Sequence, residues 1–415
     1  MKLENLIRTR EGICKKEFPV PVKEVLARYE ALYTGAINDV MREFCLLDQA
    51  LPHNIIPLRP ERTVAGLAFT VKSAPNVKIT GEMTFRTEML DAMHEDAFVV
   101  WDTSLDEEAT LWGGVMTATA AGSNITIAYT GDTAVLHFDI RTNTFPMPHL
   151  WIRVDGGVKT EVPIDRFIRV ISAKGEHTME IIYKDGKETL NRWYHPLEGK
   201  IGFEGFDADG AGILPVDARK TIELVGDSIT EGVLIDPYTY YEDDQNNRPF
   251  EDDANATYAY LTATALGLRT LHMGYGAVGA TRSGCGSVPK AVEAYPYCFD
   301  GAPVTYEHPD YILVNHGAND WGREPEVYKK DYRDLLVLIR KTHPDAKIIA
   351  LSAFCGAHEE DLRELVEEFN HSTGDDVFFI NVAHWIPLEP LHPHRDGHRI
   401  IADHLIPILR EKYGL

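Results

Sequence analysis

The chain has 415 residues, of which 44% are hydrophobic and 25% charged, which supplies enough apolar side chains for two or three domains. Its formal net charge of -23 argues against nucleic acid as a partner, because phosphate binding depends on a positive field. No apolar run approaches the length that spans a bilayer, so we expect no membrane partner.

The cellular compartment is indicated by the N-terminus and the cysteines. Residues 1–10 lack the apolar core of a secretory signal, which favours a cytoplasmic location. Five cysteines without paired metal-ligand spacing indicate free thiols in a reducing compartment. They are Cys14, Cys45, Cys285, Cys298 and Cys355.

Residues 1–120 differ in character from the rest of the chain. The segments 33–40, 56–60, 64–71 and 112–118 resemble the first part of the RraA-like, hydroxymethyl-oxoglutarate aldolase type family. That family's substrate and metal residues follow in a segment ending Arg-Asp, which is missing here. The resemblance therefore implies a partial RraA-like accessory domain that supports homo-oligomer formation, with retained aldolase activity as the weaker alternative.

Residues 121–215 contain short alternating runs separated by turn residues. The runs are 124–129, 133–138, 150–154, 167–171 and 177–183, with turns at Gly131-Asp132 and Asp155-Gly156-Gly157. This spacing predicts a β-sandwich domain. Because no catalytic pattern accompanies it, we interpret the sandwich as a scaffold that supports one side of an active site.

Residues 216–415 alternate between strands and helices, which predicts an α/β/α domain with a parallel sheet and helices on both faces. The expected strands are 221–225, 311–315, 347–351 and 377–382, and the expected helices are 328–342, 359–371 and 399–409. Ligands bind such sheets beyond the carboxyl ends of the strands.

Ser228 stands at the exit of the first of these strands and at the entrance of a helix. Gly226 permits a sharp turn, and the side chains of 227–230 are suited to cap the helix. Such a turn exposes the Ser228 hydroxyl beside free backbone N–H groups. The pattern suits a nucleophile, although an ordinary capped turn has the same composition.

Three further segments favour the nucleophile. The strand at 311–315 runs into a Gly-x-Asn-Asp turn, residues 274–281 are rich in glycine, and residues 389–398 place a carboxylate three positions before a histidine. With the Ser228 turn, they resemble the four blocks of the SGNH (GDSL-like) hydrolase superfamily. Together with the preceding sandwich, they resemble the jelly-roll plus hydrolase arrangement of carbohydrate esterase family two, whose members remove acetyl groups from sugars.

The resemblance implies a role for each matching residue. Ser228 is the nucleophile, His392 the general base, and Glu389 the group that orients the imidazole. The oxyanion donors are the backbone N–H groups of Ser228, Gly279 and Asn319. The family usually has Asp where Glu389 stands, so a backbone carbonyl is the alternative orienting group.

No cofactor is expected. A metal site is a weaker alternative, since no companion ligand motif accompanies the cluster of His392, His394, His398 and Asp396. The acidic stretch 242–253 predicts a solvated loop near the mouth of the active site, with a calcium site as the lesser alternative.

The leading interpretation is a serine esterase that deacetylates carbohydrates, such as acetylated xylo-oligosaccharides, through an acetyl-enzyme. Trp385 is a candidate stacking platform for a sugar ring, with core packing as the alternative. Two other functions remain open: a lipid or thioester hydrolase of the same superfamily, and a non-catalytic carbohydrate-binding or scaffold protein. Intact Ser228, Asn319 and His392 argue against the last.

Overall fold

The computed structural model describes residues 21–32, 67–72, 97–102, 110–112, 115–210, 217–236, 248–304 and 308–415. The chain forms two compact units, Met1–Leu105 and Asp106–Leu415. In the first unit, helix α2 spans Val22–Glu30, and strand β1 (Leu67–Lys72) pairs in parallel with β2 (Ala97–Asp102). The RraA-like segments 33–40 and 56–60 lie outside the described residues.

The second unit begins earlier than the predicted boundary at residue 120. Strand β3 (Thr110–Trp112) pairs with β4 (Val115–Ala118), and β4 pairs with β9 (Ile201–Gly210). The segment 112–118, which resembles the RraA-like family, therefore contributes to the antiparallel sheet of the second unit. The boundary lies near Leu105.

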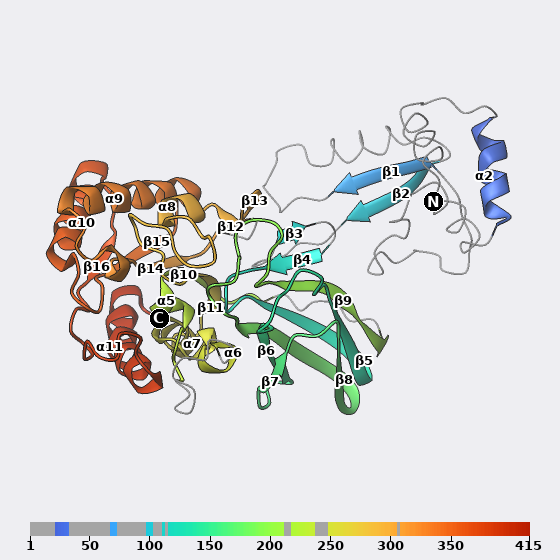
Figure 1. The fold of residues 1–415 in the computed structure, drawn as a ribbon, viewed down its shortest axis with the longest axis horizontal. Helices are drawn as coiled ribbons and strands as arrows, with labels where there is room; N and C mark the ends of the chain where they lie inside the picture. The colour runs from blue at the N-terminus through green and yellow to red at the C-terminus, as the bar shows by residue number, and fades with distance from the viewer. Residues whose placement is uncertain are drawn as a thin grey trace. The chain divides into compact units, whose positions relative to one another are not determined.

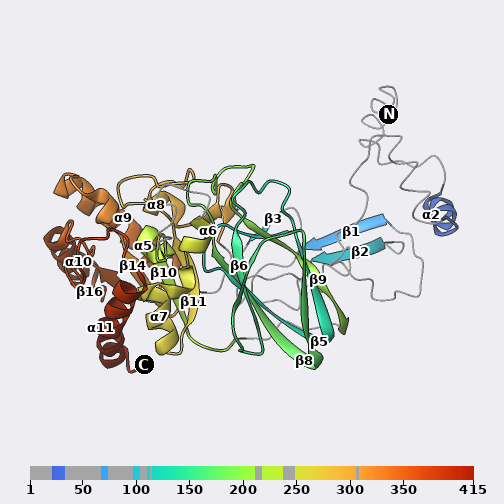
Figure 2. The same ribbon diagram turned by 60° about the horizontal axis from the view of Figure 1, so that its bottom comes forward.

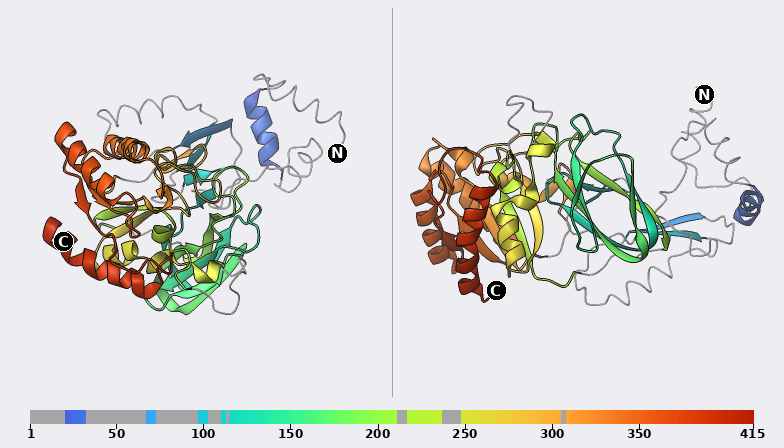
Figure 3. Two further views of the ribbon diagram at one scale, coloured as in Figure 1. Left: turned by 60° about the vertical axis from the view of Figure 1, so that its left-hand side comes forward. Right: turned by 90° about the horizontal axis from the view of Figure 1, so that it is seen from below.

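The β-domain is built on a seven-stranded antiparallel sheet with the order β3-β4-β9-β5-β8-β6-β7. Its remaining strands are β5 (Asn124–Phe138), β6 (His149–Val154), β7 (Thr160–Pro163) and β8 (Phe167–Asp185). The long strands curve around the domain interior (Figures 2 and 3). Alternate side chains pack there, including Ile127, Leu136, Leu150, Met179 and Phe203.

Two predicted breaks in this domain are absent. Gly131-Asp132 is a bulge rather than a turn: β5 continues through it, with Gly131 at φ 132°, and the register against β8 shifts there. The runs 167–171 and 177–183 are likewise parts of β8 alone. The turn after β6 is confirmed, since Asp155 and Gly156 both have positive φ.

The α/β domain has a five-stranded parallel sheet with the order β11-β10-β14-β15-β16. These strands are β10 (Thr221–Gly226), β11 (Arg269–Gly274), β14 (Tyr311–Asn315), β15 (Lys347–Leu351) and β16 (Phe378–Ile380). A short antiparallel pair, β12 (Tyr297–Phe299) and β13 (Ala302–Pro303), lies apart from them. The parallel α/β prediction is confirmed, although β11 was not predicted.

Helices cover both faces of the parallel sheet (Figure 1). One face carries α8 (Ala291–Ala294), α9 (Pro325–Thr342) and α10 (Glu359–Thr373), and the other carries α7 (Tyr258–Ala265) and α11 (Arg395–Tyr413). The strands serve both cores because successive side chains point to opposite faces. On β14, Ile312 and Val314 join the first core, whereas Tyr311 and Leu313 join the second.

Two predictions about the whole chain bear on the described residues. Cys285, Cys298 and Cys355 are free thiols, as expected, while Cys14 and Cys45 lie outside the described part. Within the described ranges, no helix has the length and apolar character needed to cross a membrane.

Candidate active site

Ser228 begins a four-residue helix, α5 (Ser228–Glu231), directly after β10. The N-cap is Asp227, whose Oδ1 accepts a hydrogen bond from the Ile229 N–H at 3.0 Å. Gly226 is required for this approach of helix to strand, because a Cβ there would lie 2.2 Å from Thr230 Oγ1. The sequence therefore holds the Ser228 hydroxyl at the carboxyl end of β10, in the predicted turn from strand to helix.

His392 meets Ser228 across the site. Its Nε2 lies 2.9 Å from Ser228 Oγ, and both side chains are partly buried. Burial lowers the pKa of His392 below its usual value, the nearby Arg248 cation lowers it further, and the Glu188 carboxylate opposes them. A neutral imidazole in this position is ready to accept the serine proton.

The structure does not bring Glu389 to His392. Glu389 is exposed, and among the described residues no hydrogen bond or ion pair joins the two side chains. Among the described residues, no backbone carbonyl forms a hydrogen bond with the His392 imidazole either, since its described bond is the one with Ser228 Oγ. The predicted orienting role of Glu389 therefore has no support from the geometry.

Asn319 lies beside the nucleophile turn and presents its side chain. Its Nδ2 is 3.3 Å from Asp227 Oδ2 and 3.2 Å from the Val278 carbonyl oxygen. Asn319 belongs to the short helix η3 (Ala318–Asp320), which follows β14. The side-chain amide therefore ties this turn to Asp227 and Val278, and the role of the Asn319 backbone N–H as an oxyanion donor stays a prediction.

The Gly279 N–H has an acceptor within the protein, and its role as an oxyanion donor stays a prediction. It donates to the Arg282 carbonyl at 3.0 Å, so a reacting oxygen would have to replace or share that acceptor. The glycine is needed on steric grounds, because a Cβ there would lie 2.7 Å from Asp320 Oδ1. The close approach of the Asp320 carboxylate is therefore a sufficient reason for a glycine at position 279.

Asp320 ties the glycine-rich segment to the Asn319 turn. This fully buried carboxylate accepts hydrogen bonds from Ala280 N at 2.9 Å and from Thr281 N at 2.8 Å. Thr281 Oγ1 donates a third bond to it at 2.7 Å. The Asp320 carboxylate therefore adds three bonds to the one from Asn319 Nδ2 to Val278 O in joining the two segments.

Trp385 packs away from the dyad. Its ring centroid lies 5.1 Å from that of His404 on α11, and it adds to the hydrophobic core on that face. An exposed aromatic residue, Trp321, follows Asn319 by two positions in the chain and is 69% exposed. Leu391, directly before His392, is also exposed. Trp321 directly follows the Asn319-Asp320 pair in the sequence, and this position could have marked it as a candidate aromatic residue for sugar binding.

The other histidines near the base have local roles. His398 is fully buried, and its Nδ1 accepts a hydrogen bond from the Tyr258 N–H at 3.0 Å. Burial lowers the pKa of His398 to about 3, so it is neutral. His394 is exposed at the N-cap of α11. In the ranges that the structure describes, no group of three or more His, Cys, Asp or Glu side chains is arranged to hold a metal ion.

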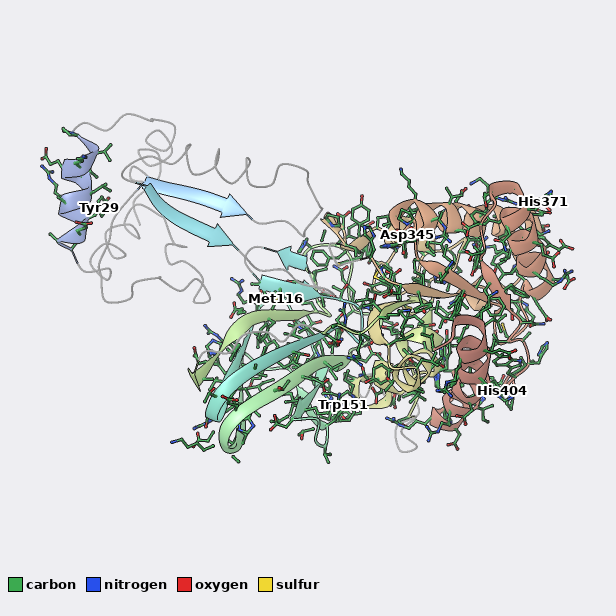
Figure 4. The ribbon with its side chains drawn as sticks, turned by 180° about the vertical axis from the view of Figure 1, so that it is seen from behind. Tyr29, Met116, Trp151, Asp345, His371 and His404 are labelled. Carbon is green, nitrogen blue, oxygen red and sulfur yellow. The ribbon has the colours of Figure 1, made fainter. Side chains whose placement is uncertain are left out.

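The acidic stretch is buried where it is described, which corrects the predicted solvated loop. Helix α6 spans Arg248–Glu251, and Asp252 and Asp253 follow it as buried residues. Asp252 Oδ1 accepts a bond from the Leu234 N–H, and Asp253 Oδ1 accepts one from Trp151 Nε1 at 3.1 Å. Figure 4 shows Trp151 on the β-domain near this junction. The composition of the acidic stretch could not predict this burial, because the groups that donate to its carboxylates come from other segments of the chain.

A serine hydroxyl bonded to an imidazole, with an amide donor beside it at the carboxyl ends of a parallel sheet, has the arrangement of a serine hydrolase site. Residues 224–400 match the model of the GDSL-like lipase/acylhydrolase family, and residues 34–127 match the Aldolase/RraA model. The two resemblances seen in the sequence are thereby confirmed. Comparison with curated proteins gave no match.

Solved structures similar to this chain include family two carbohydrate esterases. One, from Clostridium thermocellum in complex with cellohexaose, has 20% identity and a TM-score of 0.60 over 75% of this chain and 99% of its own. Another, from Cellvibrio japonicus, has 21% identity and a TM-score of 0.60 over 74% and 94%. An acetyl xylan esterase from Butyrivibrio proteoclasticus has 19% identity and a TM-score of 0.59 over 75% and 96%. At these identities the likeness establishes the fold.

Proposed function

We propose that the second unit is a serine esterase that removes acetyl groups from carbohydrates. The observation that carries this proposal is the 2.9 Å contact between His392 Nε2 and Ser228 Oγ. The match of residues 224–400 to the GDSL-like lipase/acylhydrolase family supports ester hydrolysis, and the fold shared with family two carbohydrate esterases supports a sugar ester.

In the proposed reaction, Ser228 Oγ attacks the acetyl carbonyl carbon while His392 takes its proton. The C–O bond to the sugar then breaks, and His392 gives the proton to the departing hydroxyl. Water, activated by the same imidazole, hydrolyses the acetyl-enzyme to acetate. We propose the backbone N–H groups of Ser228, Gly279 and Asn319 as the donors that stabilise the oxyanion, since Ser228 begins helix α5 and Asn319 lies beside its N-cap Asp227.

An oligosaccharide is the proposed carrier of the acetyl group. One similar structure is in complex with cellohexaose, and another is an acetyl xylan esterase. Exposed Trp321 offers an aromatic face next to Asn319, and such faces bind the apolar side of a sugar ring. We further propose a cytoplasmic reaction on imported oligosaccharides, which rests on the free thiols Cys285, Cys298 and Cys355.

The test compares acetate release from acetylated xylo- and cello-oligosaccharides with hydrolysis of longer acyl esters. We expect higher kcat/KM for the acetylated sugars. Ser228→Ala should abolish turnover without unfolding the protein, because the covalent route disappears. Turnover by Ser228→Ala at the wild-type rate would contradict the assignment.

A lipid or thioester hydrolase is the second candidate, and one observation favours it. Leu388 and Leu391, which lie just before His392, are both exposed and apolar, as a surface for a long acyl chain would be. Preference for long acyl esters in the same assay would select this function.

A further inference from the structure

Arg395, the first residue of α11, follows His392 by three residues and binds two carboxylates. Its Nε lies 2.7 Å and 2.8 Å from the two carboxylate oxygens of Asp236, and its Nη2 also bonds to Asp236. The same Nη2 donates to Asp253 Oδ2 at 3.1 Å. Because the guanidinium donors form a rigid planar fork, these bonds fix the orientation of the Arg395 side chain.

Asp253 is the buried member of this group. It is 3% exposed, whereas the Arg395 and Asp236 side chains are 49% and 41% exposed. Its Oδ1 accepts hydrogen bonds from Asn255 N at 3.0 Å and from Trp151 Nε1 of the β-domain at 3.1 Å. The Asp253 carboxylate is therefore fixed by neighbours other than Arg395.

The main chain of Asp253 contacts the end of the nucleophile helix. Its N–H donates to the carbonyl oxygen of Gly232, the C-cap of α5, at 3.0 Å. The Gly232 N–H in turn donates to the Ser228 carbonyl oxygen at 2.9 Å. Gly232 has φ 99°, and a Cβ there would lie 2.5 Å from the Asp253 carbonyl oxygen, so this close approach requires glycine.

These contacts form a closed path through both members of the dyad. From Ser228 the path runs through Gly232 to Asp253. It then crosses to Arg395 and returns along three residues of chain to His392, whose Nε2 lies 2.9 Å from Ser228 Oγ. The nucleophile and the base are thus joined by a second route besides their own hydrogen bond.

The chain between the base and Arg395 has little freedom. Pro393 is buried, its ring restricts φ, and His394 is the N-cap of α11. Among the described residues, no hydrogen bond joins the His392 imidazole to a carboxylate. Its position therefore depends on the segment that carries it, and Arg395 anchors the end of that segment.

We propose that Asp253 and Arg395 are positioning residues of the esterase reaction, which hold the segment of His392 against the nucleophile helix. This inference rests on the proposed function for its catalytic consequence. Release of Arg395 would let the start of α11 move, and His392 would lose its contact with Ser228. A displacement of about 1 Å at a catalytic group can lower a rate about 100-fold.

The first test is kinetic and uses 4-nitrophenyl acetate with the full chain. Arg395→Met should lower kcat about 10–100-fold and leave KM within about twofold, because the substrate contacts remain while the base is displaced. Arg395→Lys should lose less, since lysine keeps the charge but cannot bridge both carboxylates. Arg363→Met is the matched control and should keep the wild-type kcat: Arg363, on α10, also binds two carboxylates, Glu360 and Glu367, and is 40% exposed.

The second test follows the imidazole itself. Diethyl pyrocarbonate acylates neutral imidazole nitrogens, and tandem mass spectrometry locates the product on His392. Acylation of His392 should be several-fold faster in Arg395→Met than in the wild type or in Arg363→Met, because Nε2 is no longer held against Ser228. Ser228→Ala supplies the reference rate for an imidazole without that bond.

Asp253→Asn extends both tests. Its Oδ1 can still accept from Asn255 and Trp151, but an N–H replaces the acceptor of Arg395. We expect the same loss of kcat, and the double variant with Arg395→Met should lose no more than the larger single loss, since both changes remove one contact. Additive losses would contradict a shared role.

An Arg395→Met protein with the kinetics and acylation rate of Arg363→Met would overturn the proposal. A lower kcat without faster acylation of His392 would also overturn it, because the base would still be in place. Faster acylation in a protein whose hydrolysis does not depend on Ser228 would refute the esterase function and leave the positioning of His392 by Arg395 intact.

Discussion

At the scale of single residues, the dyad of Ser228 and His392 should carry the reaction without Glu389. We expect His392→Ala to lower kcat for a short acyl ester by about 10²–10⁴-fold, because proton transfer to the base is lost. Glu389→Gln should change kcat by less than about threefold, since an exposed carboxylate without a partner contributes little. Initial rates of the two variants, measured side by side, check this.

Equal losses in His392→Ala and Glu389→Gln would mean that the loop closes when substrate binds and brings the carboxylate to the imidazole. A solution titration separates that case from a folding defect. If Glu389 acts only in the complex, its substitution changes kcat but leaves the free-enzyme titration of His392 as it was.

The pH dependence follows from the direction of the His392 shift. Burial and Arg248 lower the pKa of His392 below its ordinary value of 6.5, so the base stays neutral to a lower pH than a free imidazole does. We therefore expect kcat/KM to be level at neutral pH and to fall only as the pH drops below 6.5. A pH profile with 4-nitrophenyl acetate checks this, and an acid limb centred above 6.5 would show that the negative charge dominates instead.

At the scale of elements, the buried pair between Arg192 and Glu231 joins the β8–β9 connection to the nucleophile helix. Both side chains are fully buried, and the Arg192 guanidinium also lies 5.5 Å from the Tyr275 ring centroid. We expect Arg192→Met to lower the free energy of unfolding by about 3–5 kcal/mol, because it leaves the Glu231 carboxylate buried and unpaired. Chemical denaturation measures the loss.

Two control variants distinguish the destabilisation caused by an unpaired buried charge from the destabilisation caused by lost side-chain packing. Replacing both partners, as Arg192→Met with Glu231→Leu, should recover much of the stability because no charge is left unpaired. Arg333→Met removes a partly exposed ion pair on α9 and should change stability by less than about 1 kcal/mol. Similar losses in all three variants would contradict the stranded-charge explanation.

Helices and strands could be predicted from the sequence where a single periodicity of apolar residues runs through the segment. The strand at 311–315 and the helices α9 and α10 follow from alternation and from an apolar stripe, and the structure confirms them. Gly131-Asp132 has turn composition, but cross-strand pairing with β8 carries β5 through it as a bulge. β11 was missed because its polar residues, including His272, are buried only through contacts with distant segments.

At the scale of the whole molecule, the unit Asp106–Leu415 should act alone. We expect a chain of residues 106–415 to fold and to keep the kcat of the full protein, because the described dyad and its supports lie within that unit. Removal of residues 1–120 should instead destabilise it. That cut deletes β3 and β4 and the buried Thr119, whose Oγ1 donates to the Cys298 carbonyl at 2.8 Å.

Thermal unfolding and size measurement of both truncated chains check this prediction. An inactive but folded 106–415 chain would show that the N-terminal unit contributes to the site. If the full chain is an oligomer and 106–415 is a monomer of equal activity, the accessory role proposed for the N-terminal unit is supported.

The sequence could predict those site residues that stand in short motifs with a recognisable order along the chain. Ser228, His392 and Asn319 occur in recognisable turns, and the structure brings all three together. Glu188 and Arg248 show no such pattern. Each is an ordinary charged residue in its local sequence, and only folding of the β8–β9 connection against α6 brings the two into an ion pair.

The placement of Glu188 and Arg192 between β8 and β9 limits how this protein can be recombined. A junction at residue 216 looks neutral along the sequence, yet it separates Glu231 from its buried counter-ion and the glycine-rich segment from the side chain packed on it. Chimaeras that exchange the β-domain for another module should therefore succeed only when the graft keeps residues 186–200 of the parent chain.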